Sequence, residues 1–323
     1  MDSGESPLVT VAVPTHNRAR SLVETLASAQ QQTYPNLEIV VADNASSDET
    51  ETVVRNAHRA DPRIRYLRND SNLGMVGNWN RLLREARGAL FLLLSDDDLI
   101  DPAGIATLVP PFRDSTVALV YCRVFRIDAG GRPFALSRPS PLRESGASFV
   151  AASLREERDA WPAAVLCRTS QIVADGGFPD TGTTTDFAQR LVAALHGDVV
   201  FVNRPVARYR VHPAMESMNF KAAMESRIRF RDWAARPSSP LQAFAAQIDS
   251  WLVRSTKSTL VSATVRRYDV DMEEIVFALR GLAVSKWRIR LIRSFYGNPV
   301  VRAAWDLRRR LRALHARYSA SNL

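Results

Sequence analysis

The amino-acid sequence predicts an α/β fold: a doubly wound, mainly parallel sheet with helices on both faces, followed by an all-helical C-terminal extension. Three observations support this prediction. Short apolar segments alternate with amphipathic segments through the first two thirds of the chain. Each of the first four apolar segments ends in polar residues that are typical of turns. No strand pattern appears after about residue 217.

The expected elements follow the β-α-β-α order of such a sheet. The first five strands are predicted at 8–13, 37–42, 64–67, 89–94 and 117–124, with helices near 18–32, 48–60, 76–86 and 102–113. A helix at 147–158, an apolar segment at 163–168, a helix at 186–196 and strand-like segments at 198–203 and 206–211 are expected next. These elements divide the chain into a sheet domain over 1–215 and a helical, basic region over 216–323.

Polar residues follow each of the first four predicted strands. They read PTHN after the first strand, DNASSD after the second, RNDSNLG after the third and SDDD after the fourth. In doubly wound sheets, ligands bind outside the carboxyl ends of the strands. We therefore expect these four segments to form one ligand site.

Three adjacent carboxylates, Asp96, Asp97 and Asp98, end the fourth apolar run. They repel one another, which costs free energy unless a cation lies among them. A hard divalent cation such as Mg²⁺ or Mn²⁺ prefers such oxygen ligands. The alternative is a solvated acidic turn, with Asp101 as N-cap of the next helix and Pro102 at its first position.

The ordered motifs VAVPTHNR, IVVADNASSDET, NLGMVGNWN and LLLSDDDLIDP resemble those of the inverting glycosyltransferases of family 2, which have the GT-A fold. The resemblance covers roughly residues 8–212. It implies a metal-dependent, inverting transfer of a sugar from a nucleotide-diphosphate sugar, UDP or TDP above all, to a hydroxyl acceptor. Bacterial polysaccharide, glycolipid and natural-product glycoside synthesis all fit. The sheet domain would then be the nucleotide-sugar-binding and catalytic domain.

The resemblance also implies roles for individual residues. Asp97 would be the leading metal ligand, with Asp98 second and His212 at the metal or the diphosphate. The family motif is commonly DxDD, but Ser95 occupies its first position here, so either Asp96 or Ser95 would reach the donor ribose. Asp43 would accept a hydrogen bond from the base. Pro14, Thr15 and Asn17 would wrap the base and ribose, with Asn72 in the turn before a helix whose Asn78 or Asn80 could face the donor.

Inverting transfer also needs a carboxylate that removes the proton of the acceptor hydroxyl. In the stretch GGFPDTGTTTDFAQRL, Asp186 stands where the family places this base, although Thr185 replaces the usual Glu. Capping of its helix is the alternative role for Asp186, and Asp180 is the alternative base. The departures at Ser95 and Thr185 leave open a catalytically degenerate, nucleotide-binding module. A dinucleotide-dependent oxidoreductase is disfavoured, because no GxGxxG follows the first strand.

The cysteines and charges indicate the surroundings of the protein. Cys122 and Cys167 lie in apolar stretches and are expected to be buried free thiols, as in a reducing cytoplasm. From residue 281 onward, ten basic residues face one acid, Asp306. With interleaved aromatic residues, this basic tail predicts contact with an anionic membrane on its inner face and hence a lipid-linked acceptor. A helix packed on the sheet domain and a homodimer interface are the alternatives, and no nucleic-acid motif is present.

Overall fold

A computed structural model describes residues 6–212, 215 and 219–266 of the chain. A ten-stranded sheet in the order β3-β2-β1-β4-β9-β6-β10-β5 forms its centre, with β7 paired to β6 and β8 paired to β10. The strands are β1 Val9–Thr15, β2 Leu37–Asp43, β3 Ile64–Arg68, β4 Leu90–Leu93, β5 Leu99–Ile100, β6 Val117–Ile127, β7 Pro133–Leu136, β8 Arg143–Ser145, β9 Val165–Arg168 and β10 Asp198–Arg210. The neighbours among β1, β2, β3 and β4 pair in parallel, as do β6 and β10. The predicted mainly parallel fold is confirmed.

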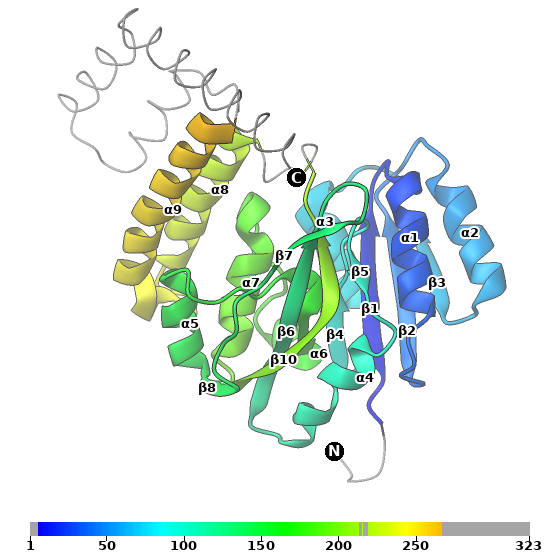
Figure 1. Cartoon of the computed structure of the whole chain (residues 1–323), viewed down its shortest axis with the longest axis horizontal. Helices are drawn as coiled ribbons and strands as arrows, with labels where there is room; N and C mark the ends of the chain where they lie inside the picture. Colours follow the sequence, from blue (N-terminus) through cyan, green and yellow to red (C-terminus); the bar gives the residue numbers. More distant parts are fainter. Residues whose placement is uncertain (1–5, 213–214, 216–218, 267–323) are drawn as a thin grey trace, which may run out of the picture.

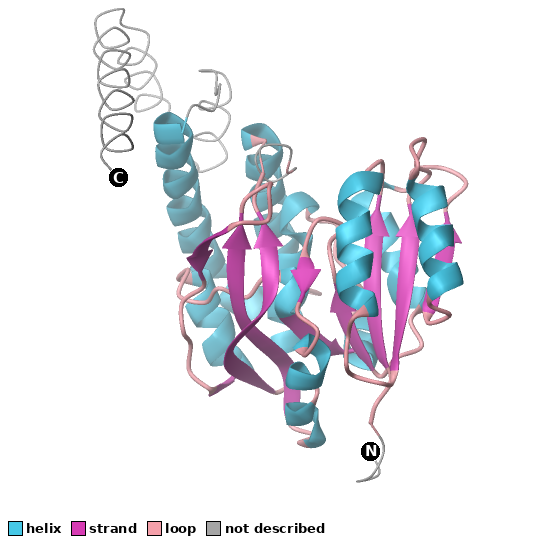
Figure 2. Cartoon of the chain, turned by 45° about the vertical axis from the view of Figure 1, so that its right-hand side comes forward, coloured by secondary structure: helices cyan, strands magenta, loops and turns pink. Residues whose placement is uncertain are grey.

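Helices cover both faces of the sheet, as the alternation of buried side chains along the strands requires (Figure 2). On one face lie α1 Ala19–Gln30, α2 Thr50–Ala60 and α4 Gly104–Leu108, over an apolar cluster that includes Val11 and Val41. The other face carries α3 Gly74–Glu85, α5 Gly146–Leu154, α6 Thr169–Ala174, α7 Thr185–Ala194, α8 Phe220–Ala234 and α9 Ala245–Arg266. The helix expected at 102–113 is divided into α4 and the 3-10 helix η1 Pro110–Arg113 at two consecutive prolines.

The expected helix cap at Asp101 is wrong. Helix α4 begins at Gly104 with Ala103 before it, and no side chain caps it. Asp101 instead forms an ion pair with Arg208 of β10, at 3.0 Å. Because Asp101 does not cap α4, helix capping does not explain the acidic cluster at residues 96–98 that precedes it.

The two strand-like segments predicted at 198–203 and 206–211 form one long strand, β10. Its register against β6 shifts on both sides of Pro205, which has no amide hydrogen to donate to a ladder. The irregularity therefore explains why the sequence pattern divides at this point. Beyond it, β10 continues to Arg210, and His212 lies two residues further along the chain.

Helices α8 and α9 pack beside α5 and α7 (Figure 1). Phe187 of α7, Phe230 of α8 and Trp251 of α9 contact one another with ring centroids 5.2–5.6 Å apart. The expected helical extension is confirmed as far as residue 266, and residues 267–323 lie outside the described part. Among the described residues, no helix has the length and apolar character needed to span a membrane. The division of the chain at residue 215 stays a prediction.

Candidate active site

The polar carboxyl ends of β1, β2 and β4 border a cavity of about 860 Å³. Eight of the residues singled out from the sequence line it: Pro14, Thr15, Asn72, Asn78, Ser95, Asp96, Asp97 and Asp186. Four others, Asn17, Asp43, Asp98 and His212, are not among its lining residues. The far side of the cavity is closed by residues 153–162 and by side chains of α7, α8 and α9. The parallel strands therefore bring segments far apart in the sequence to one site.

The acidic turn after β4 has two cationic or potentially cationic partners. Arg18 donates to Asp97, with its Nη1 2.6 Å from Oδ2, and lies 3.6 Å from Asp96 Oδ1. His212 Nε2 lies 2.9 Å from the same oxygen of Asp97. Asp97 thus lies at the centre of the turn, between a guanidinium from α1 and an imidazole from the end of β10.

Burial leaves negative charge at this turn poorly compensated. Burial raises the pKa of Asp96 to about 7, although Arg18 opposes the rise, and neighbouring Asp97 adds to it. The pKa of Asp98 lies well above its usual value for the same two reasons. Asp98 Oδ1 accepts from the Arg210 amide at 2.9 Å, while its buried Oδ2 has no hydrogen-bond partner among the described residues. Carboxylate oxygens are the ligand type that hard divalent cations prefer, but no group of three or more His, Cys, Asp or Glu side chains placed to hold a metal ion occurs among the described residues.

Arg210 fixes the position of the turn, which the sequence pattern alone does not show. Its Nε donates to the carbonyl of Asp97 at 2.8 Å, and its Nη2 donates to Glu24 of α1 at 2.6 Å. A third bond reaches the carbonyl of Ala129 at 3.1 Å. The backbone and guanidinium of one residue therefore hold both Asp97 and Asp98. The proximity of Arg210 to His212 in the motif RYRVHP is the signal that could have identified it.

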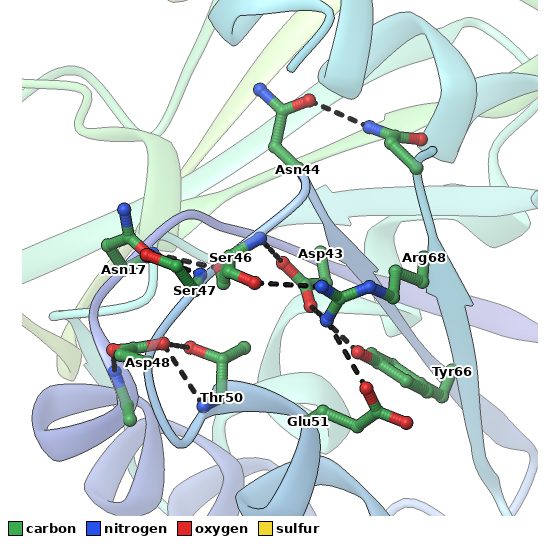
Figure 3. Close-up of polar contacts among 12 residues, drawn as sticks. Asn17, Asp43, Asn44, Ser46, Ser47, Asp48, Thr50, Glu51, Tyr66 and Arg68 are labelled. Carbon is green, nitrogen blue, oxygen red and sulfur yellow. Dashed lines mark hydrogen bonds and ion pairs between the residues drawn. The ribbon is translucent and has the colours of Figure 1, made fainter. Parts of the chain in front are cut away.

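Asp43 ends β2, is buried and is not among the residues that line the cavity; Figure 3 shows its polar contacts. Its carboxylate accepts hydrogen bonds from the Ser46 amide at 2.8 Å, from the Tyr66 hydroxyl at 2.7 Å and from Arg68 at 3.1 Å. Burial, together with the bond to Asp43, raises the pKa of Tyr66 to about 12. The next residue, Asn44, lines the cavity instead. The sequence interpretation missed this residue.

Asn17 connects two of the loops that border the cavity (Figure 3). It adopts a left-handed backbone conformation with φ 54°, and its amide donates to Ser46 Oγ at 2.9 Å. Its side-chain oxygen accepts from the Ser47 amide at 2.7 Å. Asp48 accepts from Ala19 at the start of α1, at 3.0 Å, and from Thr50 at the start of α2, at 3.1 Å. Asp48 therefore links the starts of α1 and α2.

A network of asparagines supports the same end of the cavity. Asn44 donates to the side chain of Asn72 at 2.7 Å and accepts from Asn69 at 2.8 Å. Asn78 lines the cavity, and its Nδ2 donates to the carbonyl of Ala42 at 2.8 Å. Asn80 instead exchanges two bonds with the backbone of Phe178. Asn80 therefore joins α3 to the loop before α7.

Asp186 lies in the first turn of α7 and lines the cavity. Thr184 precedes the helix without a side-chain capping bond, and Asp186 pairs instead with Arg190 one turn later, at 3.3 Å. Thr185, at the position of the usual acid, is buried and donates to the carbonyl of Pro179 at 2.9 Å. Asp180, the alternative base, is not among the lining residues.

Comparisons with known proteins agree with this geometry. The profile of glycosyl transferase family 2 matches residues 10–172, which is half of the chain. A curated relative, the GalNAc(5)-diNAcBac-PP-undecaprenol beta-1,3-glucosyltransferase of Campylobacter jejuni, is 39% identical over 104 residues, which is 32% of this chain and 34% of that protein. The chain therefore spans only about a third of that relative's length.

Two solved structures share the fold. The S. aureus TarS 1–349 complex with UDP-GlcNAc has a TM-score of 0.65 and 16% identity, over 87% of this chain and 82% of that one. The mannosyltransferase PcManGT of Pyrobaculum calidifontis, in complex with GDP-Man and Mn²⁺, has a TM-score of 0.57 and 21% identity, over 94% of this chain and 88% of that one. With its family match and fold taken together, the chain belongs to glycosyl transferase family 2 and has the GT-A fold.

Proposed function

We propose that this protein is a metal-dependent, inverting glycosyltransferase that moves a sugar from a nucleotide-diphosphate sugar to a hydroxyl acceptor. The observation that carries the proposal is the presence of the acidic turn and Asp186 in one cavity of about 860 Å³. One carboxylate group is suited to a metal-bound diphosphate and the other to the attacking hydroxyl. A pocket of this size accommodates a ligand with several rings.

The donor would bind at the carboxyl ends of β1, β2 and β4. Pro14, Thr15 and Asn72 line this end and would contact the base and ribose, with Asp96 near the ribose. Asp43 and Asn17 would act indirectly, because their bonds to the segment 46–47 shape the neighbouring loop. The two similar structures bind UDP-GlcNAc and GDP-Man, and we propose a UDP- or TDP-sugar for this chain.

Asp97 and His212 are the residues that would hold Mg²⁺ or Mn²⁺, with Asp98 behind them. When bound, such an ion supplies positive charge that stabilises the departing diphosphate. Arg18 would exchange the carboxylates of Asp96 and Asp97 for a phosphate oxygen of the donor, since it lines the same cavity. Arg210 would keep the turn in place through its bond to the Asp97 carbonyl.

Asp186 would act as the general base. Its carboxylate takes the proton of the acceptor hydroxyl while that oxygen attacks the anomeric carbon from the face opposite the diphosphate. The new carbon–oxygen bond forms as the bond to the diphosphate breaks, and the electron pair leaves with the nucleoside diphosphate. The configuration at the anomeric carbon is therefore inverted. Arg190 would hold the Asp186 carboxylate in place.

The proposal is tested by calorimetric titration of UDP, TDP and GDP into the full chain, with and without Mn²⁺. One nucleotide should bind at least about tenfold more tightly with the metal, and Asp97→Asn should remove this metal effect. Asp101→Asn is the control, because Asp101 lies in the same segment but outside the cavity. Absence of binding by every nucleotide under both conditions would contradict the donor site.

The same protein distinguishes an enzyme from a degenerate binding module. Asp186→Asn should bind the nucleotide normally but lose about 10² to 10⁴ of the rate of sugar transfer or of donor hydrolysis. Proton NMR of the product would show the inverted anomeric configuration. A wild-type chain that binds donor but neither transfers nor hydrolyses its sugar would favour the binding module.

A further inference from the structure

The far wall of the cavity, formed by residues 156–162 with Phe187, Arg227 and Trp251, has no role in the proposed donor site. This wall lies on the opposite side of the cavity from the strand ends, on the side of the molecule where α5, α7, α8 and α9 pack (Figure 1). Asp186, the proposed base, directly precedes Phe187 of this wall in the sequence. The wall is therefore the surface that a sugar-accepting molecule would contact. Its charges and rings therefore bear on the chemistry of the acceptor.

Most arginines of the cavity are neutralised by an acid of this chain. Ion pairs join Arg138 to Asp159 at 2.8 Å, Arg158 to Glu144 at 2.7 Å and Arg190 to Asp186 at 3.3 Å. Arg18 likewise pairs with the acidic turn. These four guanidinium groups have carboxylate partners without any ligand.

Arg227 of α8 differs from these four. Within the described part of the chain it forms no ion pair, and the polar contact recorded for it is a 3.5 Å approach of Nη1 to Met224 Sδ, a weak acceptor. Burial lowers the pKa of its guanidinium, which reports that the charge is poorly solvated. Glu156, which lines the same cavity, attracts the guanidinium electrostatically, but no ion pair joins the two within the described residues. A partly desolvated cation without a paired carboxylate costs free energy that an anionic ligand in the cavity would recover.

Hydrogen bonds fix Arg227 relative to the proposed base. The neighbouring Ser226 accepts from the Thr183 amide at 2.9 Å through Oγ, and from Thr184 Oγ1 at 3.1 Å through its carbonyl. Thr183 and Thr184 lead directly into the first turn of α7, which holds Asp186. The backbone segments that carry Arg227 and Asp186 are therefore joined at one junction.

Aromatic rings accompany the charge. Trp161 stacks on Tyr209 with ring centroids 4.5 Å apart, and Trp251 stacks on Phe187 at 5.2 Å. All four side chains line the cavity. Flat aromatic faces combined with a few directed polar groups are typical of ligand pockets, and the apolar faces of sugar rings pack against such surfaces.

We propose that the acceptor is a sugar that carries an anionic group, a carboxylate or a phosphate, close to the attacked hydroxyl, and that Arg227 binds this group. The inference rests on the proposed function, because it assigns Asp186 to the acceptor hydroxyl. Trp161 and Trp251 contact the sugar, and Arg227 selects its charge.

The test measures binding of three sugars to the full chain saturated with UDP and Mn²⁺: methyl β-glucuronide, glucose 1-phosphate and the neutral methyl β-glucoside. At least one of the two anionic sugars should bind about tenfold or more tightly than the neutral one. The uronide and the phosphate arms show which anion is preferred. Arg227→Gln should remove the preference, whereas Arg227→Lys should keep part of it.

Lys221→Gln is the matched control, because it removes a positive charge from an exposed position of the same helix. It should leave the preference unchanged. UDP affinity, measured for every variant, shows that the fold and the donor site are intact. If UDP binds but no anionic sugar exceeds the neutral one, or if Arg227→Gln keeps the preference, the inference is wrong while the proposed function stands. If UDP itself fails to bind, the proposed function fails.

Discussion

Asp96 lies in a turn where ionisation opposes folding. Burial raises its pKa from 3.8 to about 7, so the folded protein holds a proton that the unfolded chain has released. The contribution of this residue to stability is therefore present below about pH 4 and is lost as the pH rises towards 7. Burial shifts Asp98 in the same direction.

Replacement of Asp96 by Asn should accordingly stabilise the metal-free protein more at pH 8 than at pH 5, since Asn does not ionise. One pKa unit corresponds to about 1.4 kcal/mol, so the gain should reach at most about 4 kcal/mol. Urea denaturation in the presence of a chelator at both pH values measures it. Asp70→Asn, at an exposed position, is the control and should show little change. An equal effect of Asp96→Asn at both pH values would contradict the raised pKa.

The acidic turn and Asp186, both named from the sequence, line one cavity, and their roles stay predictions. The place of the acidic turn could be predicted because the carboxyl ends of parallel strands meet at one edge of the sheet. The sequence did not single out Asn44, which lines the cavity next to Asp43 in the chain. Successive side chains at a strand end point to opposite sides, so the choice depends on neighbouring strands. Tyr66 and Arg68 of β3 bind the Asp43 carboxylate, and nothing in the local motif indicates that pairing. Arg227 was missed because its significance lies in its place in the cavity lining and in the absence of an ion pair among the described residues, neither of which a local motif shows.

At the scale of elements, the junction between η3 Gly182–Thr184 and α8 determines how the far wall meets the proposed base. Gly182 has φ +67°, a conformation that L side chains rarely adopt. A Cβ added there would lie 2.3 Å from Ser226 Oγ and 2.8 Å from an Arg229 nitrogen. The close contact of α8 with this turn therefore depends on glycine.

Gly182→Ala should destabilise the protein by about 1–3 kcal/mol or more, through backbone strain and crowding together. Gly176→Ala separates the two causes, because Gly176 has φ +85° with nothing within 4 Å of the added Cβ. Urea denaturation should show a clearly larger loss for Gly182. Equal losses would mean that α8 moves aside without cost, and that the junction does not fix Arg227.

The order and type of the main elements followed from the sequence because apolar periodicity differs between strands and helices. Their interruptions did not. The β10 strand runs through Pro205 because a register shift accommodates a residue without an amide hydrogen, and α4 starts two residues after Pro102 rather than at it. Such details depend on pairing partners that are distant in sequence, such as Arg208 with Asp101.

At the scale of the whole molecule, most of the excess positive charge lies outside the part of the chain whose fold is described. The fold described here ends at residue 266, whereas ten basic residues against one acid lie beyond residue 280. The prediction that this basic tail binds an anionic membrane concerns residues outside the described part. It can be tested without any assumption about their structure.

The full chain should sediment with vesicles rich in phosphatidylglycerol but not with pure phosphatidylcholine vesicles, because each basic residue near an anionic surface contributes about 1 kcal/mol. A chain ending at residue 266 should stay in the supernatant with both. High salt should release the full chain. Equal sedimentation of the two chains would mean that residues before 267 make the membrane contact. If truncation instead abolishes self-association of the full chain, the tail is a homodimer interface.

The cavity has two sides of different origin along the chain. The strand ends that line it come from residues 14–97, whereas the far wall and Asp186 come from residues 156–251 and cross the limit, at residue 172, of the family match. On the proposed roles, the second stretch would decide the acceptor, and through Arg210 and His212 it would also complete the acidic turn of the first. A second stretch exchanged between family members to change the acceptor would therefore have to keep these two residues.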